Sequence, residues 1–111
     1  MAEDPLARLE ATIRARRSAD PASSYTAQLL SSGRARIAQK LGEEAIETVI
    51  AAMRGDAAAL TAEAADLLFH LAVLLADAGL SLDDVRAELA RREGVSGIAE
   101  KAARTGDCKE D

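Results

Sequence analysis

Cysteine and aromatic residues are almost missing from this sequence of 111 residues, which has one cysteine, Cys108, one tyrosine, one phenylalanine and no tryptophan. A single cysteine excludes a disulfide framework within the chain and a cysteine-rich zinc site, and it suits a reducing cytoplasm. With 2% aromatic but 49% hydrophobic residues, the core must be built from leucine, alanine, isoleucine and valine. That composition favours packed helices, so we expect one all-α domain over residues 1–111, with a polar tail from about residue 105.

Neither a targeting segment nor a membrane span is expected. Glu3, Asp4 and Pro5 stand where a signal peptide would need a basic start and an apolar stretch. The longest mostly apolar stretch, Ala64 to Ala78, is interrupted by acids and is too short to cross a bilayer. A net charge of −5 disfavours binding to nucleic acid, although a local basic patch could hold a small anionic ligand. We therefore expect a cytoplasmic protein with no membrane and no nucleic-acid partner.

Helical periodicity is the main pattern that the sequence contains. Apolar residues spaced from Leu6 to Ile13 predict an opening amphipathic helix that stops by Asp20-Pro21. Capping residues and glycines then predict a short helix after Ser23-Ser24, long helices over Arg34–Arg54 and Thr61–Ala78, a short helix from the capping box at Ser81 to Glu93-Gly94, and one or two helical turns over Ser96–Arg104. A domain this small buries a limited core, so we expect the long hairpin to be completed by dimerisation.

The two long predicted helices differ in their faces. On the first, Lys40 and the acids up to Glu47 crowd into about a third of the circle, and apolar residues cover the opposite side, namely Leu41, Ala45, Val49, Ala52 and Met53. The second is apolar nearly all round, so it should be buried, with Glu63, Asp66, His70 and Asp77 forming a narrow polar stripe. Burying carboxylates is costly unless their charge is neutralised.

Two pairs of acids at i,i+3 spacing are the candidate site. Glu44 with Glu47, and Glu63 with Asp66, each project from one face of a helix, and they can converge if the helices pack antiparallel. Four oxygen donors select a hard divalent cation, Mg²⁺ or Mn²⁺, which would leave room for phosphate oxygens of a phosphoanhydride substrate. Glu43 and Glu47 are both candidates for the base that takes a proton from water. The first pair alone is equally consistent with a solvated acidic face.

These residues resemble a known signature. Glu43-Glu44-x-x-Glu47 followed by Glu63-x-x-Asp66 resembles the EExxE and ExxD motifs of the MazG-like all-α nucleotide pyrophosphohydrolases. Within that superfamily the chain is similar to the phosphoribosyl-ATP pyrophosphatase family. The further segments that match in order and spacing are Ser24-Tyr25-Thr26, Gly33, Lys40 to Glu47, Asp66 to His70, and Gly97 to Arg104.

The resemblance implies Mg²⁺-dependent hydrolysis of phosphoribosyl-ATP to phosphoribosyl-AMP and pyrophosphate, the second step of histidine biosynthesis, in a homodimer with its site near the interface. It also implies that Glu44, Glu47, Glu63 and Asp66 are the metal ligands, with Glu43 behind them or activating water. Substrate contacts are implied for Lys40, Ser24, Tyr25, Thr26, Arg91 or Arg92, Lys101 and Arg104. His70 is either a hydrogen-bonded core residue, a group that orders Asp66, or a phosphate contact.

Two other functions are consistent with part of the pattern. A housekeeping pyrophosphohydrolase acting on noncanonical nucleoside triphosphates would share the acids but not the segments around Tyr25 and Lys101. A non-catalytic helical dimer acting as a scaffold would leave the acids without a task, and it would gain from replacing buried acids by leucine.

Overall fold

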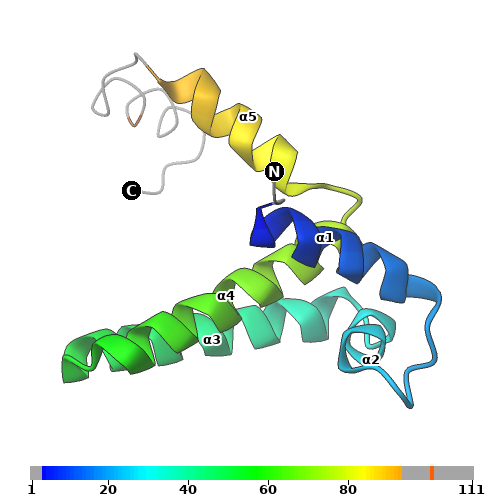
Figure 1. Ribbon diagram of the computed structural model, residues 1–111, viewed down its shortest axis with the longest axis horizontal. Helices are drawn as coiled ribbons and strands as arrows, with labels where there is room; N and C mark the ends of the chain where they lie inside the picture. The colour runs from blue at the N-terminus through cyan, green and yellow to red at the C-terminus, as the bar shows by residue number, and fades with distance from the viewer. Residues whose placement is uncertain (1–3, 94–100, 102–111) are drawn as a thin grey trace.

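The chain is all helical in the part that its computed structural model describes, residues 4–93 and 101, as the sequence predicts. Figure 1 shows two long helices side by side, with the shorter helices α1 and α2 at one end of the pair and α5 extending away from it. In chain order the elements are α1 (Pro5–Ala15), a 3₁₀ turn (Arg16–Ser18), α2 (Tyr25–Ser31), α3 (Arg34–Arg54), α4 (Ala57–Asp77) and α5 (Leu82–Arg92).

The hairpin of α3 and α4 is the frame of the molecule (Figure 1). Gly55 closes α3 with a positive φ of 72°, a conformation that a residue without Cβ adopts freely. Asp56 then caps α4, because its carboxylate accepts a hydrogen bond of 3.0 Å from the backbone N–H of Ala59. This cap starts α4 at Ala57, one turn earlier than the predicted start at Thr61.

The hydrophobic core lies at the end of the hairpin away from the Gly55 turn. There α1 crosses α4 and α2 packs on both long helices, as Figure 1 shows. The buried core cluster consists of Ile13, Leu29, Ile37, Ala72, Val73 and Ala76. It holds no aromatic side chain, although Phe69 packs against it, and aliphatic side chains fill the space as the composition predicts.

Local capping fixes both short helices and ties α5 to the rest. The Ser24 hydroxyl accepts from the N–H of Ala27 at the start of α2, and Ser81 with Asp84 forms the predicted capping box of α5. Glu10 is buried on α1, where its carboxylate accepts a 2.6 Å hydrogen bond from the N–H of Leu82 and lies 3.4 Å from the guanidinium of Arg14. A buried charge is therefore paired, and it fastens the start of α5 to α1.

Burial of the two long helices is incomplete, and the prediction that the second of them is buried is correct only in part. The apolar side chains of Val49 and Met53 on α3 do not pack in the fold, being 60% and 82% exposed, and Ile46 and Ile50 beside them are exposed as well. Helix α4 is buried in its second half, but its first half is covered by α3 alone. The short helices reach only one end of the hairpin, so apolar surface at the other end faces solvent.

Helix α4 is also longer than the apolar stretch considered from the sequence. Its 21 residues are long and apolar enough to cross a membrane by length and composition alone, a test that core helices of soluble proteins pass equally. Insertion of α4 into lipid is disfavoured because the acids Glu63 and Asp66 in its middle would be costly to bury there.

Candidate metal and substrate site

Three carboxylates from the two long helices meet at the middle of the hairpin. Glu44 of α3 and Glu63 and Asp66 of α4 each offer an oxygen atom within 4.8 Å of the others. Glu44 and Glu63 are half-buried between the helices, and Asp66 is exposed at the opening. The antiparallel packing of α3 and α4 thus brings together three of the four acids that the sequence pairs as candidate ligands.

The chemistry of this acidic cluster, Glu44, Glu63 and Asp66, fits a cation. One carboxylate oxygen of Glu44 and one of Glu63, both Oε1, are buried without a hydrogen-bond partner. The pKa of Glu63 is raised above its ordinary value by desolvation, by its hydrogen bond and charge interaction with Glu44, and by the charge of Asp66. Buried acceptors without donors are costly, and a hard divalent cation is the ligand that such oxygen atoms prefer.

The two candidate bases differ in their surroundings. Glu47 is exposed one turn after Glu44, and it lies close enough to Glu63 for a hydrogen bond that opposes the rise of the Glu63 pKa. The carboxylate of Glu43 points elsewhere: it accepts a 3.0 Å hydrogen bond from Gln39 and lies 3.5 Å from the Lys40 ammonium. The Gln39 hydrogen bond, with Lys40, lowers the pKa of Glu43, which makes its carboxylate a weaker base.

Both aromatic residues of the chain and its one histidine form a small group beside the acids. The rings of Tyr25 and Phe69 stack at a centroid distance of 6.2 Å, and His70 meets the edge of Phe69 at 5.0 Å. His70 is buried, with Nδ1 2.9 Å from the backbone carbonyl of Asp66, so Nδ1 carries the proton in that hydrogen bond. Its Nε2 lies 3.5 Å from the Tyr25 hydroxyl. His70 is thus buried and hydrogen-bonded within the fold, and a role in ordering Asp66 or meeting a phosphate stays a prediction.

Two hollows of about 250 Å³ flank the acidic cluster along α3. One lies toward α2 and is lined by Tyr25, Gln28, Leu29, Ser32, Arg36 and Lys40. The other lies toward the Gly55 turn, and its lining includes Glu47, Glu63 and Arg54. The first hollow therefore joins two residues predicted for substrate, Tyr25 and Lys40, and the second contains two of the acids.

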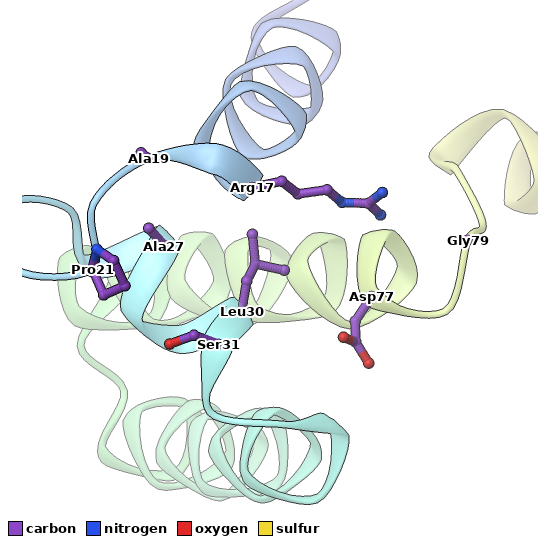
Figure 2. Close-up of a pocket in the computed structure, with 8 residues that line it drawn as sticks. All are labelled: Arg17, Ala19, Pro21, Ala27, Leu30, Ser31, Asp77 and Gly79. Carbon is purple, nitrogen blue, oxygen red and sulfur yellow. The ribbon is translucent and has the colours of Figure 1, made fainter.

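A further hollow of about 380 Å³ lies away from the acids, between the 3₁₀ turn, α2 and the end of α4 (Figure 2). Its polar side chains are already engaged within the chain. Arg17 donates to the backbone carbonyl of Ala76, Ser31 donates to the carbonyl of Gln28, and Asp77 pairs with Arg34 at 2.7 Å. We assign no ligand to this hollow, because each of these polar side chains already has a partner within the chain.

The other described residues predicted for substrate are not among those that line the two hollows beside the acidic cluster. Ser24 serves as the cap of α2, and Thr26 follows on the same turn. Arg91 and Arg92 lie on α5 and bind Glu88, whose pKa they lower to about 2 through hydrogen bonds. Lys101 is exposed, and Arg104 lies outside the described residues. Substrate contacts by these side chains stay predictions.

Among the side chains that line the hollows and were not singled out from the sequence are Gln28, Arg36 and Arg54. A usable signal was present for the two arginines. Arg36 precedes Lys40 by four residues, and Arg54 follows Glu47 by seven, so both arginines fall on the helix face that carries the acids.

The chain is similar to known proteins over most of its length. Residues 6–93 match the family model described as phosphoribosyl-ATP pyrophosphohydrolase. A protein named phosphoribosyl-ATP pyrophosphatase from Rhizorhabdus wittichii is 68% identical over 99 residues, which cover 89% of this chain and 93% of that protein. Proteins of the same name from Azospirillum brasilense and Zymomonas mobilis are each 61% identical, and the matches cover 94% of this chain and 98% and 97% of those proteins.

Proposed function

The chain belongs to the phosphoribosyl-ATP pyrophosphohydrolase family, and from this membership we propose that it hydrolyses phosphoribosyl-ATP to phosphoribosyl-AMP and pyrophosphate. This is the second step of histidine biosynthesis. The observation that carries the proposal is a family match over residues 6–93, which includes every acid of the candidate site. The chain is accordingly a hydrolase that acts on a phosphoanhydride.

We propose that Glu44, Glu63 and Asp66 hold Mg²⁺, or Mn²⁺ in its place, with Glu47 completing the ligand set from the next turn of α3. Two buried carboxylate oxygens without donors and the raised pKa of Glu63 support this assignment. A cation bound there would neutralise charge on the substrate's phosphates. Without a cation, the three neighbouring carboxylates would repel a polyphosphate, because like charges repel.

Hydrolysis requires a group that accepts a proton from water. The water oxygen forms a bond to phosphorus, the phosphoanhydride bond breaks, pyrophosphate leaves, and the proton passes to a carboxylate. We favour Glu47 for this task over Glu43, because Gln39 and Lys40 already hold the Glu43 carboxylate. Glu43 then holds Lys40 at the edge of the site.

For substrate binding we propose Lys40 and Tyr25 in the hollow toward α2, with His70 as the residue that orients Tyr25. A tyrosine ring offers a face for a purine, and an ammonium attracts phosphate. Contacts by Ser24, Thr26, Arg91, Lys101 and Arg104 belong to the same proposal. The contact by Arg91 would be made from α5, which lies outside the hairpin of α3 and α4.

We further propose that the chain is a single domain that acts as a cytoplasmic homodimer with no nucleic-acid or membrane partner. The support for a dimer is the exposed apolar face of α3, formed by Ile46, Val49, Ile50 and Met53. A second copy of the chain would cover this face, which lies on the side of α3 turned from α4.

Pyrophosphate release from phosphoribosyl-ATP tests the function directly, with ATP and a panel of deoxynucleoside and noncanonical nucleoside triphosphates assayed beside it. We expect Mg²⁺-dependent release, a strong preference for phosphoribosyl-ATP, and loss of more than about 100-fold in Glu44→Gln and Asp66→Asn, since removing even the partners of metal ligands costs about 10- to 100-fold. Glu93→Gln, on exposed surface, is the control. Preference for the triphosphates would favour the housekeeping function, and unchanged turnover in both variants would favour a scaffold.

A further inference from the structure

One face of α3 carries acids at its centre and an arginine at each end. At 100° per residue, Arg36, Lys40, Glu44, Glu47 and Arg54 fall within about 80° of one another. The acids belong to the middle of the helix, at the acidic cluster, and the arginines lie toward the two flanking hollows. A helix face of this kind is positive, negative and positive along its length.

Both arginines are available to a ligand. Both are exposed, and within residues 4–93 neither Arg36 nor Arg54 makes a hydrogen bond or an ion pair, although the charge of Arg36 interacts with that of Glu43. Arg34, two residues from Arg36, shows the contrast, because its guanidinium binds the Asp77 carboxylate at 2.7 Å. A free guanidinium at a hollow that also contains Tyr25 and Lys40 is a site for an oxyanion, since its planar fork binds phosphate through two parallel hydrogen bonds.

The charge pattern matches the chemistry of the proposed substrate better than that of a plain nucleotide. Phosphoribosyl-ATP carries a triphosphate on one ribose and a single phosphate on a second ribose, which is joined to the adenine ring. ATP lacks the second phosphate. With the cation site at Glu44, a substrate with anionic groups at both ends needs a positive side chain well away from the metal, and a nucleoside triphosphate does not.

The distance between Arg36 and Glu44 along α3 also suits the spacing of the two phosphate groups in phosphoribosyl-ATP. Arg36 precedes Glu44 by eight residues, which is about 12 Å along the helix axis. A purine and a ribose together span a distance of this order between the two phosphate groups. Tyr25 and Gln28 line the hollow between these points, where a ring face and an amide can meet the purine.

Resting on the proposed function, we infer that Arg36 binds the 5-phosphate of the phosphoribosyl arm and thereby selects phosphoribosyl-ATP over ATP. The triphosphate then lies at the acidic cluster, with its outer phosphates toward Arg54. Arg36 is a specificity residue, because its partner is a phosphate that does not react. Arg54 lies on the same helix face, but it contacts the triphosphate, which phosphoribosyl-ATP and ATP share.

The experiment compares kcat and KM for phosphoribosyl-ATP and for ATP in the full-length protein and in Arg36→Ala, Arg36→Lys, Arg54→Ala and Arg16→Ala. We expect Arg36→Ala to raise KM for phosphoribosyl-ATP by about 10- to 100-fold, the range for charge-assisted hydrogen bonds, and to leave the ATP values unchanged. Arg36→Lys should restore part of the loss, because it keeps the charge but not the fork. Arg54→Ala should lower activity on both substrates alike.

The controls separate this inference from folding and from the proposed function. Arg16→Ala, in the exposed 3₁₀ turn, should match the wild-type protein, and equal melting temperatures would exclude a folding defect. If ATP is not turned over, the comparison with ATP is replaced by inhibition of phosphoribosyl-ATP hydrolysis by ribose 5-phosphate. That inhibition should weaken in Arg36→Ala. Equal effects of Arg36→Ala on both substrates, or unchanged inhibition, would overturn the inference. Failure of the wild-type protein to act on phosphoribosyl-ATP would instead overturn the proposed function.

Discussion

Within the described residues, Glu63 has a carboxylate whose charged form is disfavoured by its surroundings in the metal-free fold. Desolvation and the neighbouring Glu44 raise its pKa, so the folded chain holds a proton on Glu63 at pH values where the unfolded chain has already lost it. The unfolded state therefore binds fewer protons, and stability falls as the pH rises above the ordinary value of 4.5 toward the raised pKa. We expect the melting temperature of the metal-free protein to fall over this window, and to fall less in Glu63→Gln.

Thermal melts of both proteins from pH 4 to pH 8 in EDTA check this expectation, with Glu93→Gln as the control for loss of an exposed charge. In Glu63→Gln the metal-free protein should melt above the wild type at neutral pH, because the repulsion with Glu44 is gone. Addition of Mg²⁺ should raise the melting temperature of the wild type and have little effect on the variant. A variant that melts below the wild type at neutral pH in EDTA would mean that the charged form of Glu63 is stabilised in the fold.

At the scale of the element, the turn between α3 and α4 decides where the acids meet. Gly55 has a left-handed conformation there, and a Cβ added to it would touch nothing within 4 Å. Gly55→Ala should thus lower the free energy of unfolding by about 1–2 kcal/mol through backbone strain alone, and Gly55→Asn by less, since asparagine tolerates this conformation. Urea unfolding measures both. Equal losses in the two variants would show that strain at φ is not the cause.

The helices were predictable from the sequence because capping residues and glycines mark their ends. Ser24, Asp56 and Ser81 accept hydrogen bonds from the first turns of their helices, and Gly55 closes α3, so helix order and most bounds follow from caps and glycines. The start of α4 was placed late because Ala57 to Leu60 carry no polar pattern to mark a helix face. Local signals of this kind say where a helix is, but not what covers it.

The site was predictable to the extent that it depends on helix periodicity. Spacing alone places Glu44, Glu63 and Asp66 on facing sides of an antiparallel hairpin, and they lie together in the structure. The meeting of Tyr25, Phe69 and His70 depends on how α2 packs against α4, a contact between distant residues that periodicity does not encode. Arg36 was missed for another reason: as a lone arginine on a polar helix face it resembles ordinary solvated surface.

At the scale of the whole molecule, the main feature is the apolar surface that stays exposed near the Gly55 turn of the hairpin. Helices α1 and α2 cover the other end, where the buried core cluster lies, and α5 extends away from the hairpin (Figure 1). The exposed apolar face of α3 has no cover from residues 4–93. Fully burying a side chain such as valine or methionine stabilises by about 1.5–3 kcal/mol, so pairing this face with a second copy would strengthen a small domain considerably.

Mass in solution tests this pairing. The wild-type protein should elute with twice the 11.6 kDa mass of the chain when light scattering is measured during size-exclusion chromatography. Val49→Asp places a charge in the middle of the exposed apolar face, and burying it in an interface would be costly, so this variant should elute as a monomer at micromolar concentration. Thr12→Asp adds the same charge on the exposed side of α1 and should remain a dimer. A Val49→Asp protein that keeps the dimer mass would place the interface on another face.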